Sequence, residues 1–115
     1  MSDSLNPIPL PDLSYLRDMT GGDEAFIKEI ITIFLDEVPN MLVTMKQSAE
    51  SGDHERLKFV THKLITQLTY VGILSAISDV KIINKESREM KDLNERVDKV
   101  INIVNYSIDN LKKMI

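Results

Sequence analysis

The sequence predicts an all-α protein: an antiparallel up-and-down four-helix bundle with a short extra helix at its N-terminal end. Apolar residues recur every three to four positions over long stretches, and all four glycines fall between these stretches. No segment alternates between apolar and polar residues over the length of a strand. Short connections between long amphipathic helices favour antiparallel neighbours. A chain of 115 residues has room for one domain and one core.

The first elements are an extended leader over residues 1–11 and a bundle domain over residues 12–115. Three prolines among the first eleven residues exclude a helix from the leader. Asp12 is expected to cap a short helix that closes at Gly21-Gly22. Asp23 then starts a long helix that ends at Gly52. We interpret it as one helix kinked at Pro39, because its apolar stripe continues in phase beyond the proline.

Three further helices complete the predicted bundle. Asp53 is expected to cap the third helix, which stops at Gly72 and buries Leu57, Val60, Leu64, Leu68 and Val71. The fourth helix is expected from about residue 74 to residue 85. Asp92 and Glu95 resemble a capping box at the start of the last helix. Its apolar stripe consists of Val97, Val100, Ile101, Val104, Ile108, Leu111 and Ile115.

Composition excludes several classes of function. Eighteen acidic residues against 14 basic ones give a net charge of -4, which argues against a nucleic-acid partner. The absence of cysteine excludes disulfides and thiol chemistry. The first residues do not form a secretory signal, and no apolar run is long enough to span a membrane. We therefore expect a cytoplasmic, monomeric protein that binds neither nucleic acid nor membrane.

Motifs for nucleotide or metal chemistry are also missing. The sequence contains no glycine-rich phosphate loop and no HExxH element, so it offers no visible means of binding ATP. Its two histidines, His54 and His62, are eight residues apart, or about 12 Å along one helix. One metal ion cannot bridge that distance. No cofactor and no metal site are predicted.

His62 is the one candidate for chemistry. On a helical projection it lies about 140° from the buried direction, whereas the apolar residues of its helix lie within about 60° of it. Lys58 is one turn before His62 and can place an ammonium beside a phosphorylated imidazole, and Thr66, one turn after it, is short enough to let a partner approach. Phe59 and Ile65 flank the histidine at angles that should leave both partly exposed, which suits a docking surface.

Thr69 is added to Phe59 and Ile65 as the third predicted docking residue. His54, in the first turn after Asp53, is expected to be an ordinary surface residue with no part in the chemistry.

These residues resemble the histidine-containing phosphotransfer (HPt) domains of phosphorelays over roughly residues 13–114. The first resembling part is Tyr15-Leu16, then Gly21-Gly22-Asp23, Phe26, Glu29 and Phe34-Leu35-Asp36-Glu37-Val38-Pro39. The second is Thr61-His62-Lys63-Leu64, with Gly72 ten residues after the histidine. Both parts occur at the separation that the family shows.

The resemblance implies that His62 is the phosphoacceptor of a carrier that neither binds ATP nor phosphorylates itself. Its imidazole would take a phosphoryl group from a receiver-domain aspartate and return it to the aspartate of a second receiver. The partners would be response-regulator receiver domains or a hybrid sensor kinase, and the receiver would supply Mg²⁺. Neutral imidazole is the nucleophile in this chemistry.

The sequence departs from the family at one position that bears on activity. The family usually has a lysine three residues after the histidine and a small residue at the fourth, where this chain has Ile65 and Thr66. Two interpretations stay open. Lys58 supplies the charge instead, or the chain is a degenerate docking module that binds receivers or other partners without phosphotransfer.

Overall fold

The structure is a computed structural model that describes residues 8–115, so residues 1–7 of the predicted leader lie outside the described part. Its elements are α2 (Ser14–Thr20), α3 (Glu24–Ser51), α4 (His54–Tyr70), α5 (Leu74–Glu86), the 3₁₀ turn η1 (Ser87–Glu89) and α6 (Leu93–Met114). Residues 8–115 contain no strand. The prediction of an all-helical protein is confirmed, and the weakly patterned fourth helix is present.

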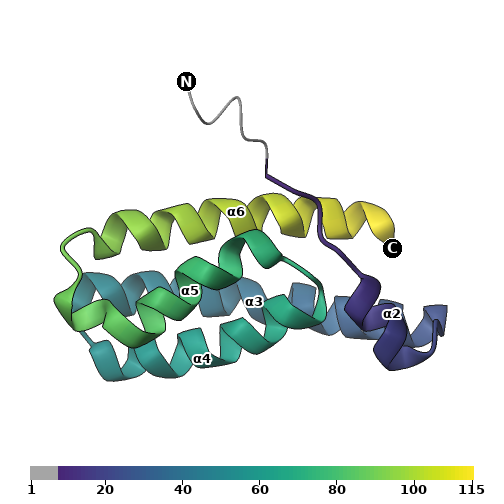
Figure 1. The fold of residues 1–115 in the computed structure, drawn as a ribbon, viewed down its shortest axis with the longest axis horizontal. Coiled ribbons are helices and arrows are strands. Elements are labelled where there is room, and N and C mark those ends of the chain that lie inside the picture. The colour runs from purple at the N-terminus through teal and green to yellow at the C-terminus, as the bar shows by residue number, and fades with distance from the viewer. Residues whose placement is uncertain (1–7) are drawn as a thin grey trace.

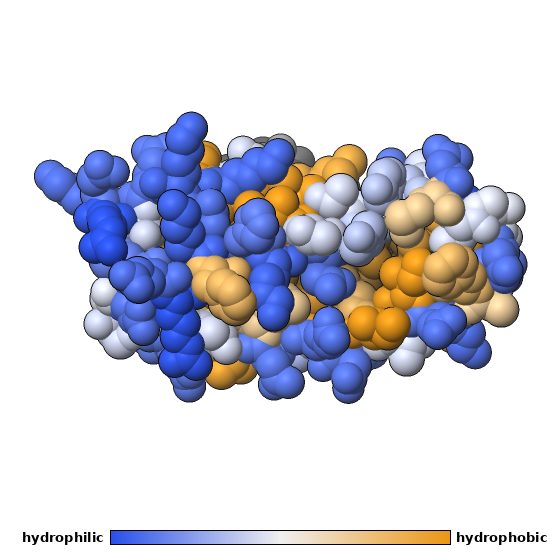
Figure 2. Space-filling model, turned by 90° about the horizontal axis from the view of Figure 1, so that it is seen from below, coloured by the Kyte–Doolittle hydropathy of each residue, from blue (hydrophilic) through white to orange (hydrophobic). Residues whose placement is uncertain are grey.

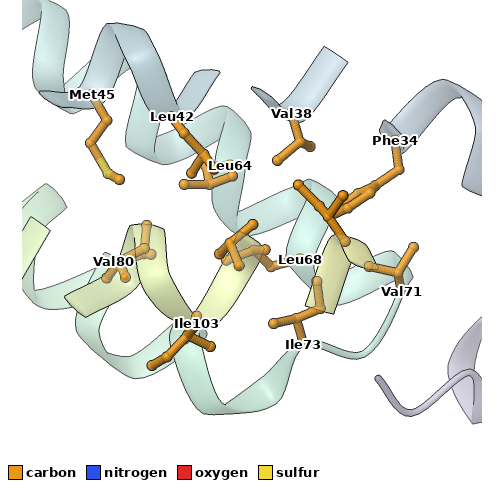
Figure 3. Close-up of a cluster of buried hydrophobic side chains, with 14 of the residues drawn as sticks. Phe34, Val38, Leu42, Met45, Leu64, Leu68, Val71, Ile73, Val80 and Ile103 are labelled. Carbon is orange, nitrogen blue, oxygen red and sulfur yellow. The ribbon is translucent and has the colours of Figure 1, made fainter. Parts of the chain in front are cut away.

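The four longer helices lie lengthwise beside one another around a shared interior (Figure 1). α3 contacts α4, α4 contacts α5, α5 contacts α6, and α6 returns to α3, while α2 packs on α3 and α4 at one end. All four longer helices contribute buried side chains to one core (Figure 3), among them Phe34, Val38, Leu42, Met45, Leu64, Leu68, Val80 and Ile103. None of the helices in the described range is long and apolar enough to cross a membrane.

The ends of α3 and α4 follow the chemistry that the sequence predicts. Asp23 accepts a hydrogen bond from the amide of Phe26, and Asp53 accepts one from the amide of Arg56. Gly52 closes α3 with a φ of 74°, a left-handed conformation that glycine adopts without strain. α3 runs as a single helix through Pro39, as predicted.

The start of α2 differs slightly from the prediction. Leu13, rather than Asp12, occupies the cap position. The Asp12 carboxylate nevertheless accepts hydrogen bonds from both the hydroxyl and the amide of Ser14. These two bonds lower the pKa of Asp12, so the residue still stabilises the first turn, from one position earlier.

The predicted capping box at α6 is wrong. The helix begins where expected, but the Asp92 side chain bonds to no backbone amide. It accepts from the guanidinium of Arg96 at 3.4 Å instead, and that same guanidinium donates to the nearly buried Asp79 of α5 at 2.8 Å. Arg96 thus connects α5 to α6, and the Asp92 carboxylate bonds to it instead of capping α6.

Several apolar residues of the helical stripes also lie outside the core. Phe26 and Ile33 of α3 and Ile115 after α6 are each nearly half exposed, whereas Ile103 of α6 is buried. A period of 3.6 residues fixes which face of a helix is apolar but not how wide a strip its neighbours cover.

Pro11 and Asp12 contact the turn between α4 and α5. The Asp12 amide donates to the Gly72 carbonyl at 3.0 Å, and Pro11 is buried beside it. Gly72 has a φ of 68°, and a Cβ placed on it would lie 1.7 Å from the Asp12 carbonyl oxygen. No side chain fits at position 72 without moving this segment.

We expect Gly72→Ala to destabilise the protein more than Gly52→Ala. Both alanines incur about 1–2 kcal/mol for the left-handed backbone, but a Cβ at position 52 meets no atom within 4 Å. The variant at position 72 also displaces Asp12 and breaks its hydrogen bond, adding about 1 kcal/mol or more. Urea unfolding gives both free energies, and equal losses would contradict the tight contact.

Candidate functional site

Three leucines determine which face of α4 is buried. Leu57, Leu64 and Leu68 are completely buried and point into the core. Because residues of a helix advance by about 100° each, the burial of these three determines which residues face solvent. His62 lies on the opposite side and is exposed, as the sequence predicts.

A polar contact with α5 stabilises this orientation of α4. Thr61 is fully buried, and its hydroxyl donates to the Leu57 carbonyl at 2.8 Å. Asn84 of α5 donates from its side-chain amide to the Thr61 hydroxyl and to the Lys58 carbonyl, both at 2.9 Å. The turn of α4 that precedes His62 is therefore bonded to α5 as well as packed against it. Sequence reasoning did not identify Asn84, because its partners lie more than 20 positions away.

His62 is the ninth of the 17 residues of α4, so full helical turns support it on both sides. Lys58, one turn before it, and Thr66, one turn after it, are both exposed, as is Thr69. Lys58 forms no salt bridge with any carboxylate in the described part of the chain, which leaves its ammonium available. The α4 surface thus presents an accessible imidazole nitrogen beside an unpaired cation.

Phe59 is 66% exposed, the highest fraction among the large apolar residues of the described chain. The Lys63 ammonium lies 5.2 Å from the centre of its ring, within range of a cation–π contact. The two residues border a shallow groove of about 250 Å³ between α3 and α4, which Met41 and Val60 also line. Figure 2 shows this side of the molecule, where apolar surface is interspersed among polar side chains.

Ile65 is partly exposed, as its helical angle predicts, but it is less exposed than Phe59. It is half-buried and packs against the core, and its carbonyl accepts from the Thr69 hydroxyl at 2.8 Å. The exposed apolar surface beside His62 therefore consists chiefly of Phe59.

The expectation that His54 is an ordinary surface residue is wrong. Its ring is partly buried, and its Nδ1 lies 3.0 Å from the hydroxyl of Ser87, itself buried in η1. This hydrogen bond joins the start of α4 to η1, directly after α5. His54 thus takes part in a contact between elements, whereas His62 is exposed.

No metal-binding cluster accompanies His62 in the described part of the chain. Within residues 8–115, no group of three or more histidine, aspartate or glutamate side chains is placed to hold a metal ion. A groove of about 500 Å³ lies between α3 and α6, lined by Leu42, Val43 and Ile101 among others, and includes no residue of α4. His62, Lys58 and Thr66 therefore lie on exposed surface of α4.

Comparisons with protein-family models, with curated proteins and with solved structures found no match to this chain.

We expect Phe59→Asp and Ile65→Asp to differ in stability. Phe59 is mostly exposed, so its replacement should change the free energy of unfolding by no more than about 0.5 kcal/mol. Ile65 packs on the core, and a carboxylate there should lower stability by about 1–3 kcal/mol. Chemical denaturation measures both, and equal tolerance of the two substitutions would show that Ile65 is not packed.

Proposed function

We propose that this protein is a histidine phosphotransfer carrier, with an HPt-like antiparallel four-helix bundle that presents His62 to receiver domains. The observation that carries the proposal is the exposed imidazole midway along α4, on a helix whose inner face is set by buried leucines. Lys58 lies beside it and forms no salt bridge within residues 8–115. The resemblance of residues 61–64 and Gly72 to the family's phosphoacceptor segment supports the same assignment.

The proposed reaction is the one that the family resemblance implies. An unprotonated ring nitrogen of His62 attacks the phosphorus of a receiver's aspartyl phosphate in line with the departing carboxylate oxygen. The N–P bond forms, the P–O bond breaks, and the receiver regains a free carboxylate. In the return step a second receiver's carboxylate attacks the same phosphorus, and the imidazole leaves. Mg²⁺ held by the receiver neutralises charge in both directions.

The bundle contributes position rather than acid–base groups. α4 holds the imidazole where a partner can reach it in line, and Phe59 with its neighbouring groove offers apolar surface for a transient contact. An unengaged cation at Lys58 balances part of the charge that arrives with the phosphoryl group. No ATP site is needed, because the high-energy group comes from the partner.

A second candidate function is a docking module that binds receivers without transfer. It is favoured by Ile65, which stands where the family usually has a lysine and whose side chain packs on the core. Such a module would bind receivers equally well with or without His62.

Phosphotransfer should depend on His62 and not on His54. After incubation with phosphorylated receiver domains, we expect acid-labile, base-stable label on the chain, its loss in His62→Gln, and its retention in His54→Gln. His62 is exposed, so His62→Gln should change stability by less than about 0.5 kcal/mol. Label that persists in His62→Gln and disappears in His54→Gln would reverse the assignment. Receiver binding without label in any variant would favour the docking module.

Lys58→Ala should slow transfer or shorten the lifetime of phosphohistidine by up to about tenfold. A cation about 4 Å from a phosphoryl charge contributes roughly 1 kcal/mol in water and more near a protein surface, and about 1.4 kcal/mol corresponds to a factor of ten. Ile65→Lys should partly rescue this loss, because a lysine stem can lie on the apolar surface while its ammonium reaches solvent.

The two lysine variants require matched ionic strength, since salt screens exposed charges over about 10 Å at 0.1 M. Wild-type rates in Lys58→Ala, with a large gain in Ile65→Lys, would show that Lys58 does not replace the missing lysine.

A further inference from the structure

Hydrogen bonds from α4 to α5 and to η1 show which residues of these elements lie side by side. Ser87 lies beside His54, and Asn84 lies beside the turn formed by residues 58–61. The two helices therefore run in opposite directions. Toward the connecting turn at Gly72, residue numbers increase along α4 and decrease along α5. One helical turn beyond residue 58 is His62, and one turn back from Asn84 brings α5 to residues 80 and 81. Lys81 is thus level with His62.

The burial pattern of α5 places Lys81 on the side next to α4. Val80 is fully buried, Asn84 faces α4, and Asp79 faces α6 through its bonds with Arg96 and Lys99. Lys81 follows the buried residue by one position and precedes Asn84 by three, so it lies at the solvent edge of the face toward α4. The row of surface residues on α5 nearest to His62 includes this lysine.

The Lys81 ammonium is exposed and, within the described residues, forms no salt bridge. Packed helices are about 8–10 Å apart, and a lysine side chain extends roughly 6 Å, four methylenes beyond its Cα. It can therefore reach a group attached to His62 without any change in the backbone. The other charged residues exposed near this surface are Lys58, Lys63 and Glu55 of α4 and Lys85 of α5.

We propose that Lys58 and Lys81 form a two-sided phosphoryl site with His62, with Lys81 supplying from α5 the cation that Ile65 does not supply from α4. This inference rests on the proposed function and adds a residue from a second helix to its site. The two ammoniums approach from different directions, one along α4 and one across the α4–α5 contact. Together they leave the outward side of His62 open for in-line attack.

The test separates this site from the question of receivers. His62 is phosphorylated in the full chain with phosphoramidate, a small donor, and the ³¹P signal is followed as a function of pH. His62→Gln identifies the signal. A cation about 6 Å from the phosphoryl oxygens should lower the midpoint of the titration by about 0.5 pH unit. Lys81→Ala should therefore raise the midpoint by about that amount, and Lys81→Arg should restore it.

Lys85→Ala is the matched control, because it removes the same charge from the same exposed side of α5, one turn farther from the level of His62. We expect a shift of less than about 0.2 pH unit at 0.15 M salt, where screening acts over about 8 Å. A midpoint in Lys81→Ala equal to that of wild type, or equal shifts in the two variants, would overturn the assignment of Lys81.

Transfer from receivers is measured on the same variants. If Lys81→Ala shifts the midpoint while no receiver phosphorylates the wild-type chain, the two-lysine site stands and the proposed function fails. If receivers phosphorylate His62 but Lys81→Ala behaves as wild type in both measurements, the function stands and the role of Lys81 is refuted.

Discussion

The feature on which the rest of the site depends is the rotational setting of α4. Three buried leucines would by themselves permit some rolling of the helix, because apolar packing is not directional. The bonds from Asn84 to the Lys58 carbonyl and the Thr61 hydroxyl are directional. A roll of α4 would break both bonds, each of which contributes on the order of 1 kcal/mol. Apolar packing determines which face of α4 is buried, and the two hydrogen bonds from Asn84 determine the rotation of α4 about its axis.

Because packing and hydrogen bonds together orient α4, His62 has a defined position although it lies on an open surface. Catalytic side chains in enzymes are commonly positioned by the walls of a pocket. Here the backbone of a packed helix does the positioning, and the side chain of His62 needs no support from its neighbours. In the proposed function, the same exposure would give a receiver domain room to contribute the metal ion and the phosphoryl group.

The parts predicted from the sequence are those governed by local chemistry. Asp23, Asp53 and Gly52 begin and end their helices as expected, because each acts on backbone groups within a few residues. Outward projection of His62 follows from the spacing of the leucines on the same helix. The errors concern partners distant in sequence: His54 bonds to Ser87, and Arg96, which is held by Asp79 of α5, also bonds the Asp92 carboxylate that was expected to cap α6. Helical periodicity contains no information about which helix lies alongside.

The contact between Asp12 and Gly72 has a consequence for the order of folding. It joins two backbone groups sixty positions apart and closes a loop that contains α2, α3 and α4. Closing a flexible loop of that length costs on the order of 4 kcal/mol in chain entropy, more than one hydrogen bond returns. The contact becomes favourable only once α3 and α4 have packed, because their packing already brings Asp12 close to Gly72. Formation of the contact between Asp12 and Gly72 should accordingly be a late event, and the Asp12 amide should exchange hydrogen earlier than those of the buried helices.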